Sequence, residues 1–320
     1  MAGIPAERLP VIAVVGATAT GKSDLGVAIA QRVGGEVVNA DPSQFYRGMD
    51  IGTAKLTPEE RHGVPHHQLD VLGVTQEASV AAYQSAARDD LRSIRDRGRV
   101  PVVVGGSGLY VRALLDVLAI PPTDPQVRDR WEEALEQGGV AALYERLRSL
   151  DPEAATRIEP RNGRRIVRAL EVIELTGRPF SATLPRREYA VPAVQLGLAA
   201  DRAVLDGRIG ARVDRMWERG LVDEVRGLVP LGLREGRTAS RTIGYAQVLA
   251  LLDGTLTEES AREETVTATR RLVRRQESWF RADPRISWLP HDATDLVERA
   301  LALVEPDQQS RDGDGSYNPL

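Results

Sequence analysis

Short apolar runs alternate with amphipathic stretches over the first third of the chain. The apolar runs are "PVIAVVG" (10–16), "GEVVNAD" (35–41) and "VPVVVGG" (100–106). Between them, "SDLGVAIAQRVG" (23–34) and "VAAYQSAARDDLRSIRDRG" (80–98) carry apolar residues at helical spacing. Buried strands that alternate with helices are typical of a parallel sheet with crossover helices. The pattern therefore predicts an α/β fold with helices on both faces of a parallel sheet.

The pattern changes at "IPPTDP" (120–125), where prolines break the alternation and three helical segments follow. These segments predict an inserted helical subdomain. "AVQLGLAA" (193–200) then indicates a return to the sheet, and "RISWLP" (285–290) indicates an edge strand. The domains expected are a P-loop α/β core, first part (1–121), the helical insertion (122–188), core completion with C-terminal helices (189–304) and a disordered tail (305–320).

Composition narrows the class of protein but does not identify it. With 320 residues, 42% hydrophobic and 28% charged, the chain is ordinary for a soluble globular protein. The absence of cysteine excludes disulfides and thiolate metal sites. The net charge of −4 argues against a protein that coats nucleic acid non-specifically. Because no apolar run approaches membrane-spanning length and no signal peptide is present, we expect a cytoplasmic protein.

The first motif with clear chemistry is "GATATGKS" at 16–23, which fits the phosphate-binding pattern G-x-x-x-x-G-K-[ST]. A buried strand precedes it and a helix follows it, as this motif requires. Its backbone N–H groups approach phosphate oxygens, while Lys22 adds charge and Ser23 can ligate Mg²⁺. The residues predicted to bind a nucleotide such as ATP, or a diphosphate, are Gly16, Ala17, Thr18, Ala19, Thr20, Gly21, Lys22 and Ser23.

Two strand ends bring further groups to the same edge of the predicted sheet. Asp41 ends the second strand, where its carboxylate can act as a general base or hold Mg²⁺; its alternative is a helix N-cap. The next strand ends in Gly105, Gly106 and Ser107 rather than in the carboxylate typical of a P-loop ATPase. The glycines let a substrate approach the backbone, although the same sequence can also be a simple turn.

Basic residues are concentrated near the end of the chain, where "RRLVRRQESWFR" (270–281) carries five arginines and one glutamate. Arginines neutralise phosphates and aromatic side chains stack on exposed bases, so the segment is a candidate RNA surface. It is equally a helix end with buried apolar residues and solvated arginines. The adjacent His66 and His67 cannot easily chelate one ion, and we interpret them as structural.

Four motifs together resemble the bacterial tRNA dimethylallyltransferases, also called tRNA isopentenyltransferases or IPP transferases, over about residues 10–290. "GATATGKS" is similar to the family's GPTASGKT, and "DPSQFYRGMDIGTAK" (41–55) to its DSMQVYRGMDIGTAK. "VVVGGSGLY" (102–110) is similar to VGGTGLY, and "RRIVRALE" (164–171) to QRLIRALE. "RTIGYAQ" (241–247) and "VRRQESWFR" (273–281) stand where the family has its IGY and KRQ-TW-R segments.

The resemblance implies a P-loop-like core and transfer of a dimethylallyl group from dimethylallyl diphosphate to N6 of the adenosine 3′ to the anticodon, position 37. It implies action on tRNAs that read codons beginning with U, and a monomer that contacts the anticodon stem-loop and no membrane. Catalysis is assigned to Asp41 as the base, to Lys22, and to Ser107 at the channel between the substrates, with Mg²⁺ on Ser23. Arg208 and Arg212 are expected to close over the diphosphate, since they lie one turn apart on one helix face.

The resemblance also implies a set of residues that contact tRNA. They are Asp41, Pro42, Ser43, Gln44, Ser107, Arg128, Arg164, Arg165, Arg168, Arg241, Gly244, Tyr245, Arg274, Arg275, Gln276, Trp279 and Arg281. Pro42 and Ser43 depart from the family's Ser-Met, so we expect a hydroxyl contact to the adenine or to Asp41 to be missing.

Two other functions fit part of the sequence. A small-molecule P-loop kinase would place ATP in the loop and use Asp41 to activate an acceptor hydroxyl, with the helical insertion as a lid. It leaves residues 44–55 and the arginine-rich segments unexplained. A nucleotide-dependent RNA-binding switch would explain the arginines, but it lacks the carboxylate that usually follows the third strand.

Overall fold

The computed structural model describes residues 9–183 and 187–304, which separate into two compact units. The core unit comprises residues up to Leu115 together with those from Val191 onward, and the helical unit comprises Asp116–Ala190. The predicted insertion of 122–188 falls within the helical unit. The tail predicted to be disordered, 305–320, lies outside the described residues.

The core unit contains a parallel sheet of six strands in the order β3-β2-β4-β1-β5-β6. The strands are β1 (Val11–Gly16), β2 (Gly35–Asn39), β3 (His66–His67), β4 (Val100–Gly105), β5 (Ala193–Ala199) and β6 (Ile286–Pro290). The central strands are apolar throughout because helices cover both of their faces. The sequence prediction of a parallel α/β sheet is confirmed, as is the edge position of β6.

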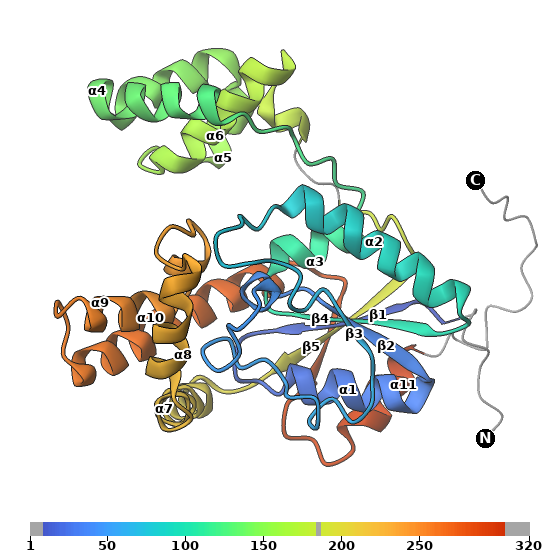
Figure 1. Ribbon diagram of the computed structural model, residues 1–320. Coiled ribbons are helices and arrows are strands. Elements are labelled where there is room, and N and C mark those ends of the chain that lie inside the picture. The colour runs from blue at the N-terminus through green and yellow to red at the C-terminus, as the bar shows by residue number, and fades with distance from the viewer. Residues whose placement is uncertain (1–8, 184–186, 305–320) are drawn as a thin grey trace, which may run out of the picture. The chain divides into compact units, whose positions relative to one another are not determined.

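Helices pack on both faces of this sheet (Figure 1). The helix α1 and the last described helix, α11, lie against one face, while α2, α3 and part of α10 lie against the other. The helices α7 to α9 pack with α10 around a second apolar cluster. The core-unit helices are α1 (Lys22–Val33), α2 (Val80–Asp96), α3 (Gly108–Leu115), α7 (Arg202–Glu218), α8 (Leu221–Leu228), α9 (Tyr245–Leu252), α10 (Glu258–Arg281) and α11 (Leu296–Val304).

The helical unit is built from α4 (Pro125–Leu150), α5 (Pro152–Arg157) and α6 (Gly163–Thr176) around its own apolar core. The helix α4 kinks at Gly139, whose φ of 75° is accessible to glycine at little cost. Asp124 caps α4 and Asp151 caps α5, each by accepting hydrogen bonds from backbone N–H groups. The starts of α4 and α5 are thus marked in the sequence by an aspartate followed by proline.

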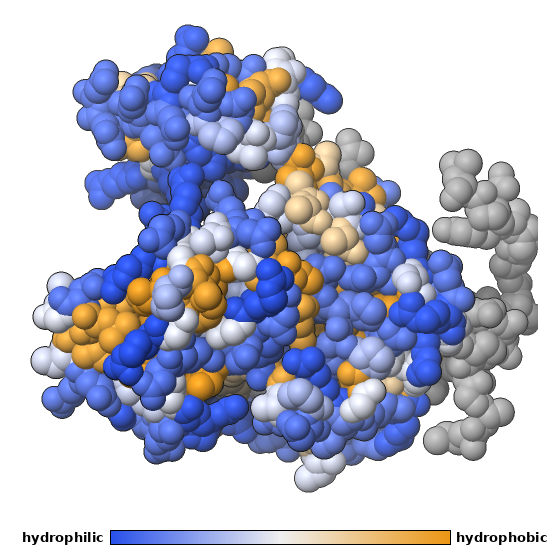
Figure 2. All heavy atoms as spheres, viewed as in Figure 1, coloured by the Kyte–Doolittle hydropathy of each residue, from blue (hydrophilic) through white to orange (hydrophobic). Residues whose placement is uncertain are grey.

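The visible surface is mostly hydrophilic, with hydrophobic residues gathered over the region of α9 (Figure 2). Leu251 and Leu252 at the end of α9 are only partly buried against the apolar cluster of the core unit. Within residues 9–183 and 187–304, none of the helices combines the length and the apolar character needed to cross a membrane.

Candidate active site

The phosphate loop connects β1 to α1, has three residues at positive φ and lines a cavity. Gly16 and Gly21 have φ values of 136° and 92°, and Ala19 also lies at positive φ, 69°. Inside the loop, the Thr20 hydroxyl donates to the Ala17 carbonyl at 2.8 Å and Lys22 Nζ donates to the same oxygen at 2.6 Å. Because α1 begins at Lys22, its unpaired N–H groups and positive dipole end face an incoming anion.

Gln276 of α10 supports the phosphate loop from a distant part of the sequence. Its Oε1 accepts a hydrogen bond from the Thr18 amide at 2.9 Å, and its Nε2 donates to the Gly106 carbonyl at 2.9 Å. A Cβ on Gly106 would lie 2.5 Å from this amide nitrogen, so a larger residue there would displace the Gln276 amide from its two partners. The Gln276 side chain is buried and its amide joins two backbone segments, so contact of Gln276 with tRNA stays a prediction.

Asp41 stands directly after β2 and is held from two sides. Asn39, which is buried, accepts from the Asp41 amide at 3.0 Å and donates to the Asp41 carbonyl at 3.0 Å. Asp41 Oδ1 accepts from the Ser43 amide at 3.0 Å and from the Ser43 hydroxyl at 2.6 Å. Among the described residues no donor contacts Oδ2. One oxygen of Asp41 therefore caps the short helix Pro42–Phe45, as the N-cap alternative predicts, and the other stays open, so the role as a base stays a prediction.

Ser43 changes the expected effect of the Pro42–Ser43 sequence. The expectation that Asp41 lacks a hydroxyl contact is wrong, because the Ser43 hydroxyl supplies one. Pro42 occupies the first position of the short helix, where a missing N–H costs nothing. Gln44 uses its Nε2 within the protein, donating to the Thr53 carbonyl at 3.1 Å, while it lines the cavity.

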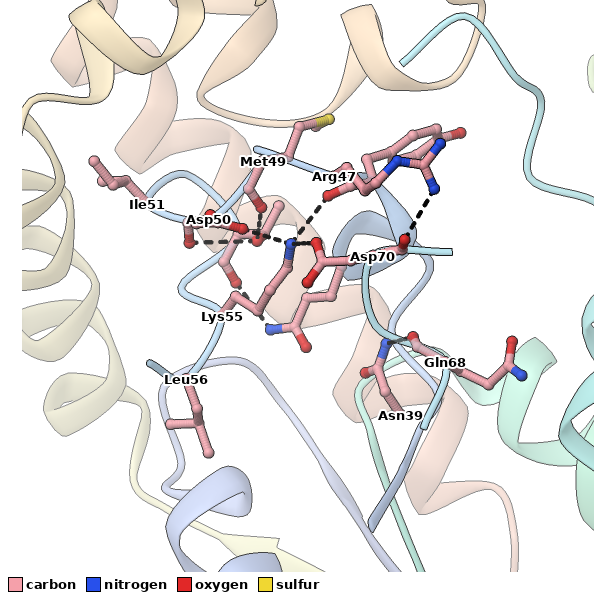
Figure 3. Close-up of polar contacts among 12 residues, drawn as sticks. Asn39, Arg47, Met49, Asp50, Ile51, Lys55, Leu56, Gln68 and Asp70 are labelled. Atoms are coloured by element: carbon pink, nitrogen blue, oxygen red, sulfur yellow. Dashed lines mark hydrogen bonds and ion pairs between the residues drawn. The ribbon is translucent and has the colours of Figure 1, made fainter. Parts of the chain in front are cut away.

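Residues 46–55 fold around the buried ammonium group of Lys55 (Figure 3). Lys55 Nζ lies 2.6 Å from Asp50 Oδ1 and 2.5 Å from Asp70 Oδ1, and it donates to the Tyr46 carbonyl at 3.0 Å. Two carboxylates and a carbonyl thus accept hydrogen bonds from all three N–H groups of the ammonium. Burying an ammonium without such partners would cost a large free energy. The acidic, glycine-rich stretch of the "RGMDIGTAK" motif is fixed in this way.

Glu224 of α8 holds the same loop from the other side. Its carboxylate accepts from the backbone amides of Asp50 at 3.0 Å, Ile51 at 2.7 Å and Gly52 at 3.3 Å. The Tyr245 hydroxyl donates to this carboxylate, and a Cβ on Gly52 would lie 2.5 Å from the Tyr245 ring. Burial is the largest cause that raises the pKa of Tyr245 far above its ordinary value, and the Glu224 charge raises it further. The Tyr245 hydroxyl therefore keeps its proton and remains a hydrogen-bond donor.

These segments enclose a cavity of about 550 Å³. Its lining joins the phosphate loop, Asp41, the 51–56 loop and one face of α7, and includes six cationic side chains and three acidic ones. Arg208 Nη1 donates to the Ala19 carbonyl at 3.3 Å, and Arg212 Nη2 donates to the Thr53 carbonyl at 3.5 Å. Burial lowers the pKa of Lys22 to about 8, although the Asp41 charge opposes the shift.

Three kinds of side chain in this cavity can serve different parts of one substrate. Lys22 and the α7 arginines supply positive charge at the phosphate loop. Ile51, Leu56 and Met216 supply apolar wall, and the open oxygen of Asp41 supplies a proton acceptor. The cavity is therefore suited to a molecule with an anionic end and a short apolar end, next to a base that can accept a proton.

Comparisons with known proteins identify the family. The family model described as IPP transferase matches residues 44–283. A tRNA dimethylallyltransferase of Thermobifida fusca is 64% identical over 299 residues, which are 92% of this chain and 94% of that protein. The chain belongs to the IPP transferase family.

Solved structures of this family have the same fold. The full-length tRNA isopentenylpyrophosphate transferase of Bacillus halodurans is 39% identical, with a TM-score of 0.67, covering 92% of this chain and 94% of that one. A eukaryotic dimethylallyltransferase described as acting on tRNA is 28% identical, with a TM-score of 0.78, covering 91% of this chain and 77% of that one. The comparisons do not favour a small-molecule kinase.

Two of the arginines that the family resemblance assigns to tRNA are used inside the helical unit. Arg128 contacts the Glu171 carboxylate through Nε at 3.2 Å and Nη2 at 2.5 Å. Arg168 Nη1 donates to the same carboxylate at 2.8 Å and also to the Pro122 carbonyl at 2.9 Å. Glu171 is fully buried, so the two guanidinium groups balance its charge. RNA contact by these arginines stays a prediction, and it would have to use their remaining donors.

The other predicted tRNA residues differ in exposure. The exposed arginines with no side-chain partner among the described residues are Arg164, Arg165, Arg241, Arg274, Arg275 and Arg281. Trp279 is 45% exposed and packs on Gly108, with the Arg112 guanidinium 5.7 Å from its ring. Gly244 and Tyr245 are buried, so the geometry does not fit direct RNA contact by either. Ser107 is partly exposed next to Gly106, but it is not among the cavity-lining residues.

Sequence reasoning missed the residues that hold the site together. Asn39 and Glu224 are the clearest cases, and Gln276 was noticed but given a different role. Asn39 lies two residues before Asp41 at the strand end, which is a usable signal for an Asx-type contact. Glu224 lies far along the chain from the loop it binds, and no local pattern marks it.

Proposed function

We propose that this chain transfers the dimethylallyl group of dimethylallyl diphosphate to N6 of the adenosine at position 37 in tRNAs that read codons beginning with U, releasing diphosphate. Its relatives carry the name tRNA dimethylallyltransferase, and a related structure is described as acting on tRNA. The observation that carries the proposal is the open Oδ2 of Asp41 in the same cavity as the phosphate loop. That pairing places a base beside a leaving-group site.

The diphosphate is expected to bind at the phosphate loop. The loop amides, the N-terminus of α1 and Lys22 offer hydrogen bonds and positive charge, and Arg208 and Arg212 approach from α7. The dimethylallyl group then extends over the apolar wall formed by Ile51, Leu56 and Met216. This orientation directs the carbon that carries the diphosphate toward Asp41.

In the reaction, the N6 nitrogen of adenine forms a bond with C1 of the dimethylallyl group. The bond between C1 and the diphosphate oxygen breaks, and its electron pair leaves with the diphosphate. Asp41 Oδ2 accepts a proton from N6, which removes the positive charge that develops on nitrogen. Lys22 and the loop amides stabilise the negative charge that develops on the diphosphate. Because the adenine must leave its stack to reach the cavity, a single-stranded anticodon loop is the expected substrate.

Magnesium fits this site through one protein ligand. The Ser23 hydroxyl lines the cavity beside Lys22, and no contact of that hydroxyl occurs among the described residues. No three acidic, histidine or cysteine side chains gather as a metal cage within residues 9–183 and 187–304. A site with one hydroxyl suits Mg²⁺, which prefers to keep waters and substrate phosphates as its other ligands. When bound, the ion would offset the charge of the diphosphate.

The test is direct transfer of a label. The chain is incubated with labelled dimethylallyl diphosphate, Mg²⁺ and an unmodified tRNA transcript, and the product is digested to nucleosides. We expect label on adenosine 37, and none when position 37 is guanosine or when the tRNA reads codons that do not begin with U. Label elsewhere would contradict the proposed position. Absence of label in tRNA, together with γ-phosphate transfer from ATP to a small acceptor, would support the kinase instead.

A further inference from the structure

Four arginines, three of them on the helix α7 and Arg219 directly after its last residue, form a row along the cavity. Arg208, Arg212, Arg215 and Arg219 are spaced at i, i+4, i+7 and i+11, which places them on one helix face. All four line the cavity. Like charges at this spacing repel one another and destabilise a helix unless something anionic lies against them. The row therefore indicates an anionic ligand along most of the helix.

The four arginines divide into an inner and an outer pair. The inner pair, Arg208 and Arg212, is anchored, because each guanidinium donates to a backbone carbonyl of the cavity wall. Arg215 and Arg219 are exposed, and neither forms a side-chain hydrogen bond or ion pair with any described residue. Arg202 on the same helix behaves differently, since it pairs with Asp206 and Glu277. The outer pair thus lacks carboxylate partners of the kind that Arg202 has.

One diphosphate is too short to occupy the whole row. With a rise of 1.5 Å per residue, the axis between Arg208 and Arg219 is about 16 Å long. The phosphate loop and the inner pair lie at one end of that distance, where the diphosphate is expected. A polymer with regularly spaced phosphates can reach the other end while one of its bases enters the cavity. RNA is therefore the anion that the geometry favours for the outer pair.

We propose that Arg215 and Arg219 form a subsite for the RNA backbone phosphates that flank the nucleotide inserted into the cavity. The proposal rests on the proposed function, in which an adenosine reaches Asp41. The subsite contacts phosphates only, so it contributes affinity and position without reading sequence. It is separate from the diphosphate site, which the inner pair serves.

The test compares the Arg215→Ala/Arg219→Ala double variant with the unaltered chain in the binding of an unmodified tRNA transcript at several salt concentrations. Loss of two phosphate contacts to single-stranded RNA should lower the slope of log affinity against log salt by about 1.4. The KM for tRNA should rise at least tenfold, while inhibition by inorganic pyrophosphate and the KM for dimethylallyl diphosphate stay unchanged. The Arg215→Lys/Arg219→Lys variant should keep most of the salt slope, since lysine also binds phosphate as a point charge.

The matched control is Arg226→Ala/Arg299→Ala, which removes the same charge from exposed ion pairs on α8 and α11. An equal loss of tRNA affinity in the control, or an unchanged slope in the double variant, would overturn the subsite. Weaker inhibition by pyrophosphate in the double variant would also overturn it, because the pair would then belong to the diphosphate site. Binding is measured without turnover. An unaltered chain that binds tRNA but transfers no dimethylallyl group would therefore refute the proposed function and leave the subsite standing.

Discussion

Asp41 of the core unit and Glu171 of the helical unit both accept hydrogen bonds from neighbouring groups, but the two carboxylates differ in how many acceptor positions are occupied. Glu171 of the helical unit is fully buried and accepts from Arg128, Arg168, the Thr123 hydroxyl and the Asp124 amide. Asp41 of the core unit accepts two hydrogen bonds, both from Ser43, and both go to one oxygen. Its second oxygen has no donor among the described residues, and Asp41 is one of the residues that line the cavity.

The difference teaches how to separate a structural charge from a reactive one. A carboxylate whose lone pairs are all occupied contributes to stability and has nothing left to offer a substrate. A carboxylate held by one oxygen keeps its orientation and retains an acceptor. The same contrast holds for arginines, since Arg128 and Arg168 are balanced by Glu171 whereas Arg215 and Arg219 are unbalanced.

The sharpest test of the comparison is Asp41→Asn. Asparagine keeps an oxygen that accepts from Ser43, so we expect the fold and tRNA binding to persist. Turnover should fall by roughly 10²–10⁴-fold, because an amide cannot accept the N6 proton. Rates of dimethylallyl transfer and tRNA affinity are measured side by side, with Asp89→Asn on the exposed face of α2 as the control. Unchanged turnover would show that Asp41 is not the base.

Glu171→Gln should give the opposite result, which is a loss of stability rather than a loss of turnover. Two partly buried guanidinium groups lose their counter charge, and the new amide group lies at a fully buried position facing them, so the free energy of unfolding should fall by about 3 kcal/mol. Chemical denaturation measures the loss, and Glu153→Gln, from an exposed ion pair, should change it by less than about 0.5 kcal/mol. A stable Glu171→Gln chain with impaired transfer would reverse the assignments of the two carboxylates.

The Glu171 contribution also depends on pH. Burial alone would raise the pKa of Glu171, but hydrogen bonds from Arg128 and Arg168 outweigh it and hold the pKa below the ordinary 4.5. A lowered pKa in the folded state means that the stabilisation is complete above pH 4.5 and is lost as the pH falls through the lowered value. The difference in stability between the unaltered chain and Glu171→Gln should therefore shrink below pH 4.5.

A smaller effect is expected from the titration of Lys22, which should change the affinity of the cavity for pyrophosphate. Because burial lowers its pKa to about 8, the ammonium loses its charge as the pH rises above that value. We expect inorganic pyrophosphate to bind about tenfold more weakly at pH 9 than at pH 7, from the fall in the protonated fraction. In Lys22→Arg the charge persists, so the difference between the two pH values should vanish. Equal affinities at both pH values in the unaltered chain would contradict the prediction.

The smallest effect is expected from Ser43→Ala, which removes one of the two hydrogen bonds to Asp41 Oδ1. A hydrogen bond to a charged group contributes about 1.5 kcal/mol, so kcat should fall roughly tenfold. The KM for tRNA should not change, since the hydroxyl acts through Asp41. Ser43→Thr should restore kcat, and Ser149→Ala on the surface of α4 should have no effect. A rise in the KM for tRNA with kcat intact would assign Ser43 to RNA contact instead.

Local sequence patterns were sufficient to predict these strands and the phosphate loop. The strand runs 10–16, 35–41 and 100–106 and the return at 193–200 are strands within a residue or two, because continuous apolar runs bounded by glycine have few alternatives. Asp41 was placed correctly at the cavity because the carboxyl ends of parallel strands share one edge.

Other residues could not be assigned from local pattern because their partners are distant. Gln276 binds Thr18 and Gly106, and Tyr245 binds Glu224. Both stand in motifs that the family resemblance linked to tRNA, yet both are buried. A motif shows that a residue matters, and burial decides whether it touches the substrate or holds what does.

The sequence by itself determined the parallel sheet, the phosphate loop and the strand end that carries Asp41, because each depends on neighbours within a few residues. Only the tertiary structure decided which charged groups have all of their hydrogen-bonding positions occupied within the protein and which keep one available. The Glu171 carboxylate is enclosed by groups from residues 123–128 and by Arg168, and the second oxygen of Asp41 has no donor among the described residues. A carboxylate has a structural role or stays available to a substrate according to the donors that folding brings to it, and for Glu171 most of those donors lie more than 40 residues away in the chain.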